Sequence, residues 1–145
     1  MTGVAAHVYG EFIAALATKS VNLSSDAIKV MLVTSSYTPA QATDQYASTP
    51  QAYEISGTGY TAGGVALSSV TIADTTDVWT LSAANAVWTT ATFTARYAIV
   101  YDSSPGSYAS DPLIGYVDFG GNQSPSGVTF TIAWASGIVL QFTAS

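Results

Sequence analysis

The sequence predicts a mostly β, single-domain protein: an antiparallel β-sandwich, jelly-roll-like, with a short N-terminal helix and one further short helical turn. A chain of 145 residues corresponds to one domain and can bury a sizeable core. From residue 53 onward, short β-branched and aromatic runs alternate with Gly, Pro, Ser and Asn, which is typical of antiparallel sandwiches. No domain boundary or internal repeat is visible. We therefore expect residues 1–145 to form one β-sandwich domain, with residues 1–22 as an N-terminal helical segment packing on it.

The N-terminal helix is predicted over residues 7–19, HVYGEFIAALATK. Val8, Phe12 and Leu16 recur at four-residue spacing, as on one face of an amphipathic helix. Gly10 weakens this prediction because glycine disfavours a helix interior.

A buried strand and a helical turn are expected next. Residues 27–34, AIKVMLVT, are apolar on both faces, which predicts a central strand covered on both sides. In residues 37–49, Thr38 is a candidate N-cap and Pro39 stands at the first helical position. That pattern predicts one or two helical turns.

Six further strands are expected in the remainder of the chain. They are VALSSVTIA (65–73), VWTLS (78–82), AVWTTATFTARYAIVYD (86–102), PLIGYVDFG (112–120), VTFTIAW (128–134) and GIVLQF (137–142). Turns are predicted at residues 103–111 and 120–127. The last two strands are expected to form a hairpin closed at ASG, with Gly137 at the permissive turn position.

Residues 54–64, EISGTGYTAGG, contain the spacing G-x-G-x-x-A of a dinucleotide-binding turn. That turn works by joining a strand to a helix whose N-terminal amides face a pyrophosphate. Here a predicted strand follows the glycines, and no Lys lies nearby. We interpret the segment as a tight turn or bulge in which Gly57, Gly59, Gly63 and Gly64 adopt positive φ.

The charge balance argues against two classes of partner. Three basic residues stand against nine acidic ones, for a net charge of −6. Binding to phosphates requires clustered Lys and Arg, so neither nucleic acid nor an anionic membrane is an expected partner. Only 8% of residues are charged, against about 25% in an average domain. A surface with so few charged residues is common where most of it faces other protein subunits, and it is also common in secreted β-proteins. The N-terminus has no basic region typical of a signal peptide, so none is expected.

The sequence offers little catalytic chemistry, and we expect no catalytic residue and no cofactor. His7 is the single histidine, and it is predicted to be a surface or packing residue. There is no cysteine and no G-x-S-x-G motif. Paired carboxylates from Glu54, Asp102, Asp111 and Asp118 are the remaining possibility for a hydrolase.

Metal binding has weak candidates. Asp102 and Asp111 flank a loop rich in Gly, Pro and Ser, and Asp74 and Asp77 flank two threonines. Calcium accepts carboxylate and carbonyl oxygens, so these are its candidate ligands. Aspartates at such positions more commonly form Asx-turns, and no metal is our expectation.

The aromatic residues have two interpretations. Trp79 and Trp88 lie in segments that otherwise contain Thr and Ser, so at least one is expected to be exposed. They are candidates for contact with another protein, which is favoured, or with a glycan. Trp134 alternates in register with Phe130 and Ile132 and is expected in the core.

Four stretches resemble, in the same order, successive blocks of small structural proteins of tailed bacteriophages. They are SDAIKVMLVTSSYTPAQATDQYAS, EISGTGYTAGGVALSSVTI, VWTTATFTARYAIVYDSS and PLIGYVDFGGNQSPSGVTFTIAWASGIVL. The resemblance runs from about Asp26 to Leu140. It implies a component of the virion and carries no catalytic residue with it.

This resemblance favours a capsid decoration or cement protein that binds the major capsid protein and copies of itself, as a dimer or trimer. We expect its sheet edges to be covered by the N-terminal segment or by a neighbour. Two alternatives stay open. One is a tail, baseplate or fibre-associated module with a glycan surface at Trp79 and Trp88. The other is a small β-sandwich hydrolase using the acidic loops.

Overall fold

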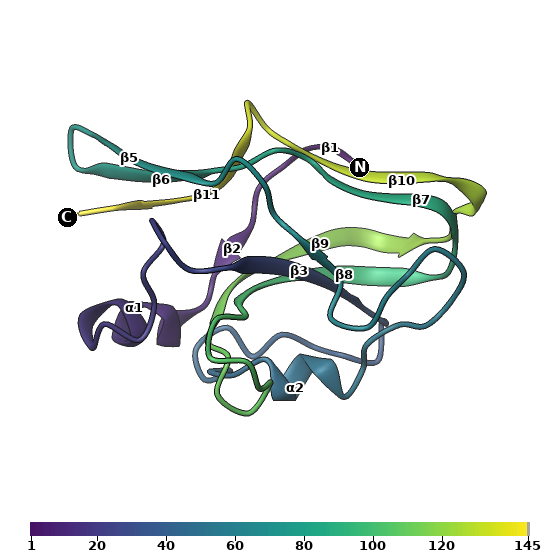
Figure 1. The fold of residues 1–145 in the computed structure, drawn as a ribbon, viewed down its shortest axis with the longest axis horizontal. Coiled ribbons are helices and arrows are strands. Elements are labelled where there is room, and N and C mark those ends of the chain that lie inside the picture. Colours follow the sequence, from purple (N-terminus) through teal and green to yellow (C-terminus); the bar gives the residue numbers. More distant parts are fainter. Residues whose placement is uncertain (145) are drawn as a thin grey trace.

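The computed structural model describes residues 1–144 and is mostly β, with its strands in two layers and two short helices beside them (Figure 1). The predicted β-sandwich is confirmed; its jelly-roll connectivity stays a prediction. The strands are β1 (Thr2–Val4), β2 (His7–Val8), β3 (Ile28–Val33), β4 (Val65–Ala66), β5 (Thr71–Thr75), β6 (Val78–Ser82), β7 (Ala86–Thr92), β8 (Ala95–Asp102), β9 (Leu113–Gln123), β10 (Ser126–Trp134) and β11 (Ile138–Thr143). The helices are α1 (Gly10–Ala17) and α2 (Ser48–Gln51).

One layer is a five-stranded antiparallel sheet in the order β2-β9-β8-β3-β4. The prediction that β3 is a central strand is confirmed, because it lies between β8 and β4 and five of its six residues are buried. The opposite layer covers one face of this sheet. Helix α2 and the neighbouring loops lie along the other face (Figure 1).

The other layer consists of two three-stranded sheets, β1-β10-β7 and β11-β6-β5. The predicted hairpin between the last two strands is wrong. Strand β10 pairs with β7 and β11 pairs with β6, and the chain runs in one direction through both (Figure 1). Gly137 adopts positive φ as expected, but the turn that it shares with Ser136 projects from the sheet before the chain continues. Each of the last two strands thus pairs antiparallel with a strand earlier in the chain, β7 or β6, in place of its neighbour in sequence.

Two long predicted strands are each divided between the layers. Residues 65–73 form β4 in the five-stranded sheet and the start of β5 in the opposite layer, separated by a break where Ser69 has positive φ. Residues 86–102 form β7 and β8, and the chain crosses between layers at Phe93, which is buried against Phe130. An alternating pattern persists through such a crossing, so it does not mark the boundary.

Turn and loop positions were predicted with mixed success. Residues 103–111 form the predicted loop. The connection predicted at residues 120–127 is present but shorter, because β9 continues to Gln123 and β10 begins at Ser126, which leaves Ser124 and Pro125 between the strands.

The N-terminal helix is shorter than predicted. It begins at Gly10 and not at residue 7, because His7 and Val8 form β2 and pair with Tyr116 and Gly115 of β9. Phe12 is the buried residue of the helix. The glycine thus stands at the first helical position, where it costs less than in the interior.

The predicted helix start at Thr38 is wrong. The carboxylate of Asp44 accepts hydrogen bonds from the backbone N–H of Ala40 and from the Tyr37 hydroxyl, and these bonds hold residues 40–44 in an isolated turn. The helix in this region, α2, begins at Ser48.

The glycine-rich segment has the backbone geometry that the sequence predicts. Gly57, Gly59, Gly63 and Gly64 all have positive φ, and the short strand β4 follows them with no helix. A Cβ at Gly64 would overlap the carbonyl of Val30 in β3. The glycines therefore allow close backbone approach and build no phosphate cradle.

Several sheet edges are partly covered by other parts of the chain. Strand β1 pairs with β10 at Ala133 and Trp134, and β2 pairs with β9 at Gly115 and Tyr116, so the N-terminal segment covers part of two edges. Thr58 pairs with Thr92 at the edge of β7, and Ala6 donates a hydrogen bond to Val139 of β11. Among the described residues, no segment pairs with the outer edge of β5.

Gly64→Ala is expected to destabilise the protein by at least about 3 kcal/mol, because the new Cβ overlaps β3 and the backbone has positive φ. Gly106→Ala is the matched control, since Gly106 also has positive φ but open space around its Cβ position. Its cost is expected to be about 1 kcal/mol. Urea denaturation of both variants measures the difference, and equal destabilisation would contradict the close approach.

Candidate functional site

Asp102 and Asp111, which were suggested for catalysis or calcium, each have a structural role. Asp102 accepts a hydrogen bond from the N–H of Ser104 in the predicted Asx geometry. Asp111 accepts bonds from the N–H groups of Gly106 and Ser107, and so fixes the loop between β8 and β9. Both side chains are buried. Among residues 1–144, no three His, Asp or Glu side chains form a group suited to a metal. No such cluster therefore supports Asp102 and Asp111 as calcium ligands.

The other two acidic candidates are also held in place. Asp118 forms an ion pair with Arg96, in which Nε lies 2.8 Å from Oδ1, and the guanidinium lowers the pKa of the Asp118 carboxyl. Glu54 accepts hydrogen bonds from the Tyr60 hydroxyl and the Gly63 N–H. His7 is exposed on β2, with its ring 5.2 Å from that of Tyr116, which fits the predicted surface or packing role.

Two buried tyrosines, Tyr9 and Tyr37, and the partly buried Tyr60 connect loops to the five-stranded sheet. The Tyr9 and Tyr37 hydroxyls are 2.7 Å apart, and Tyr37 also donates to Asp44. The Tyr60 hydroxyl accepts a hydrogen bond from the Leu32 N–H and donates to Glu54. Burial is the main cause that raises the pKa of Tyr9, Tyr37 and Tyr60 above the ordinary value, so these hydroxyls stay protonated as donors.

Sequence reasoning missed the relation between Asp26 and Asp102. The Asp102 Oδ2 atom is buried with no hydrogen-bond donor, and the Asp26 carboxyl lies beside it. A proton shared by the two carboxyls would supply that donor. Burial and the neighbouring Asp26 raise the pKa of Asp102 to about 6. Asp26 precedes β3 and Asp102 ends β8, so the antiparallel pairing of these two strands was the signal that could have joined them.

The three tryptophans occupy different environments. Trp79 on β6 is 42% exposed, whereas Trp88 on β7 is 2% exposed. Trp134 is buried, as predicted. The expectation that at least one of Trp79 and Trp88 is exposed is confirmed, but the two do not form a shared surface. Trp88 packs against Phe130 and Tyr60 in the core.

Trp79 lies on the inner face of the β11-β6-β5 sheet. It stands directly opposite Asp74 of β5 and Phe142 of β11, and side chains opposite one another in antiparallel strands share a face. Toward the middle of the molecule, the same face presents Leu81 and Leu140, which are fully buried. The sheet therefore extends past the layer that covers it and leaves its outer end open.

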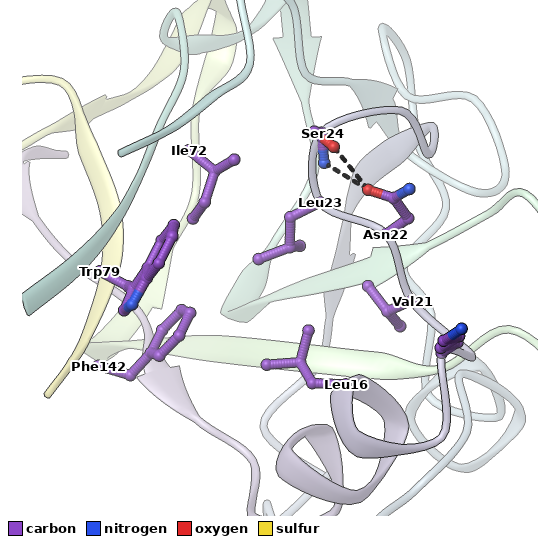
Figure 2. A pocket seen from close by; sticks show the side chains of 9 residues that line it. Leu16, Val21, Asn22, Leu23, Ser24, Ile72, Trp79 and Phe142 are labelled. Carbon is purple, nitrogen blue, oxygen red and sulfur yellow. Dashed lines mark hydrogen bonds between the residues drawn. The ribbon is translucent and has the colours of Figure 1, made fainter. Parts of the chain in front are cut away.

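The open end forms an apolar groove of about 510 Å³, which we call the Trp79 groove. Ile72, Trp79 and Phe142 line its sheet side, and the opposite side is formed by α1 and the loop that follows it (Figure 2). The lining residues from that opposite side are Leu16, Lys19, Val21, Asn22, Leu23 and Ser24. The groove is thus a gap between the two layers, with apolar walls and a polar rim.

The polar groups of Asn22 and Ser24 at the rim of the groove form hydrogen bonds with each other. The Asn22 Oδ1 atom accepts hydrogen bonds from the N–H and the hydroxyl of Ser24, at 3.1 and 2.6 Å (Figure 2). Lys19 follows α1 and is exposed. Sequence reasoning identified Trp79 but not the other walls. The turn-forming stretch Asp74–Asp77 between two strands was the signal that places Asp74 opposite Trp79.

Comparisons with known proteins add no relative. The chain matches no known protein family, and no curated protein or solved structure is significantly similar to it. No helix among residues 1–144 is long and apolar enough to cross a membrane. The functional inference therefore depends on the residues of this chain.

Asp102→Asn is expected to change the pH dependence of stability. Because the folded-state pKa of Asp102 is raised, its stabilising contribution is complete below the unfolded value near 4 and is lost as the pH rises through about 6. The loss is expected to reach up to about 3 kcal/mol. Asparagine keeps the acceptor for Ser104 and supplies a donor toward Asp26, so the variant should be more stable at pH 7.

Urea denaturation between pH 4 and pH 8 measures this effect. Asp74→Asn, on the exposed β5–β6 hairpin, is the control and should keep the wild-type pH profile. If Asp102→Asn destabilises the protein at pH 7, or keeps the wild-type pH profile, the ionised Asp102 carboxylate does not have the cost described here.

The two tryptophans should differ in their contribution to stability. Trp88→Ala is expected to cost about 3–5 kcal/mol because it leaves a cavity between the layers. Trp79→Ala is expected to cost less than about 1 kcal/mol, since the side chain lies at an open end. Thermal unfolding of the pair measures both, and a large loss for Trp79→Ala would show that the groove is part of the core.

Proposed function

We propose that this protein is a non-enzymatic structural component of a bacteriophage virion, and that it binds the outer head shell as a decoration or cement protein. The observation that carries the proposal is the Trp79 groove, an open apolar end of the β-sandwich that lies beside the unpaired edge of β5. A half-exposed tryptophan in an apolar groove is typical of a protein contact. The resemblance of residues 26–140 to structural proteins of tailed phages supports the particle as its setting.

The roles of the acidic residues also favour a structural function. Glu54, Asp102, Asp111 and Asp118 each accept hydrogen bonds or form an ion pair that holds a loop or a strand. A hydrolase would need two of them free to face a substrate. This is why we rank the hydrolase last.

Decoration of a shell places particular demands on a small protein. It has to fold before it attaches, and it has to occupy many equivalent sites. The low content of charged residues suits a surface that is partly covered in an assembly. Association of copies as a dimer or trimer would multiply weak contacts to the major capsid protein.

The second candidate is a tail, baseplate or fibre-associated module that binds a glycan. The exposed ring of Trp79 favours it, because sugars stack on such rings. Trp88 is buried and cannot contribute to that surface, and the rim groups of Asn22 and Ser24 already bond to each other. A glycan would therefore find few directed hydrogen-bond partners in the groove.

The stoichiometry of the chain in purified particles of the virus that encodes it tests the proposal. A decoration protein is expected at a fixed, high ratio to the major capsid protein, from near unity to one chain for every few capsid subunits. Quantitative mass spectrometry of intact particles measures this ratio. Heads from a deletion mutant should assemble but break at a lower temperature, and added purified protein should restore them.

Two results would contradict the decoration role. A handful of copies per particle would place the protein in the tail or a fibre, and its complete absence would reject a virion component. The Gly64→Ala protein is the matched control for add-back, because it is expected to be destabilised and so not to restore the heads.

A further inference from the structure

The outer edge of β5 is a strand edge that the described chain leaves unpaired along its whole length. Strand β5 pairs with β6 on one side, from Thr71 to Thr75, and no described segment pairs with its other side. Four of its five residues are exposed. Its outward N–H and C=O groups can therefore accept an additional extended strand.

This free edge lies beside the Trp79 groove. Ile72 belongs to β5 and also lines the groove, so a strand added to β5 would run past the groove opening (Figure 2). In an extended strand, alternate side chains point to the same face. A large apolar side chain on the added strand would enter the groove while its backbone pairs with β5.

The charge at this edge is negative. Asp74 is on the groove face of β5, opposite Trp79, and Asp77 is in the adjoining turn. Both are exposed, and neither has a cationic partner within residues 1–144, where the ion pair is Arg96–Asp118. Lys19 lies on the opposite wall. The strand side of the groove thus favours a cationic group, and the ring of Trp79 adds a cation–π surface.

We propose that β5 and the Trp79 groove bind an extended peptide segment of a partner protein, with one large apolar side chain in the groove and Lys or Arg two residues away facing Asp74. The segment adds a strand to the β11-β6-β5 sheet. This inference rests on the proposed function in one respect, since it identifies the contact through which a decoration protein would hold a shell subunit.

Two other occupants fit less well. A second copy of the chain, paired through β5 edges, would bring the Asp74 and Asp77 carboxylates of both copies close together, and like charges across strands are destabilising. A glycan would need rim donors and acceptors, which Asn22 and Ser24 use for each other.

Selection of peptide binders from a displayed library of random nine-residue segments, with the isolated wild-type protein as bait, tests the proposal without any particle. Selected peptides are expected to share a large apolar residue with Lys or Arg two positions away. In a titration followed by amide NMR, the largest shifts should fall on Thr71–Thr75 and on the loop after α1.

Four variants make the test specific. Trp79→Ala should weaken the binding of the selected peptides at least about tenfold. Asp74→Asn combined with Asp77→Asn should weaken this binding about threefold or more, and the effect should diminish in high salt. Lys19→Ala should strengthen peptide binding, because it removes a positive charge that repels the Lys or Arg of the peptide. Val87→Thr is the control, since Val87 is an exposed apolar residue on β7, away from the groove, and should leave affinity unchanged.

The proposal is overturned if no selected peptide depends on Trp79, if acidic peptides are preferred, or if the shifts fall on another face. Dimerisation abolished by Trp79→Ala would assign the groove to a second copy, and saturable binding of a soluble oligosaccharide in place of peptides would assign it to a glycan. If the protein is abundant in particles but fails the peptide test, the decoration role stands and only the proposed contact at β5 and the Trp79 groove is rejected.

Discussion

The requirement that β3 be covered on both faces is the constraint on which the rest of this structure depends. Five of its six residues are buried, so a second layer has to cover one face and a layer of loops the other. The glycine-rich segment reaches β3 along the edge that also pairs with β4: Gly64 approaches Val30, and the Tyr60 hydroxyl lies 3.0 Å from the Leu32 nitrogen. Within the same segment, Glu54 accepts hydrogen bonds from the Tyr60 hydroxyl and the Gly63 N–H. A motif that looks like a nucleotide-binding turn is thus explained by close backbone packing.

The extent to which strand edges and sheet faces are covered also explains the open end of the molecule. The N-terminal strands pair with part of the edges of β9 and β10, and Thr58 pairs with Thr92 of β7. The β11-β6-β5 sheet extends past the five-stranded sheet (Figure 1), and its inner face is covered at Leu81 and partly exposed at Trp79. Paired edges are protected from unspecific strand pairing, and the unpaired edge of β5 beside an apolar groove allows a specific contact.

Local patterns in the sequence predicted the fold class, the buried strand β3, the glycine conformations and the burial of Trp134. They did not reveal where a strand changes layers, because residues such as Phe93 keep the alternating pattern through the crossing. The predicted hairpin at Gly137 failed for a related reason: the turn residues are present, but distant pairing with β6 decides the direction of the chain. The site was predicted only as far as Trp79. Its walls come from three separate segments, α1 with its following loop, β5–β6 and β11, and the Asp26–Asp102 pair likewise joins residues 76 positions apart.

Amide hydrogen exchange, measured on the free protein and on the protein bound in particles, tests the central claim that one strand edge is left for a partner. In the free protein, the outward-facing amides of β5 are expected to exchange rapidly, whereas those of β3, β8 and β9 are protected. In the particle, new protection should appear at Thr71–Thr75 and around Trp79. Slow exchange along β5 in the free monomer, or new protection confined to another face, would contradict the account.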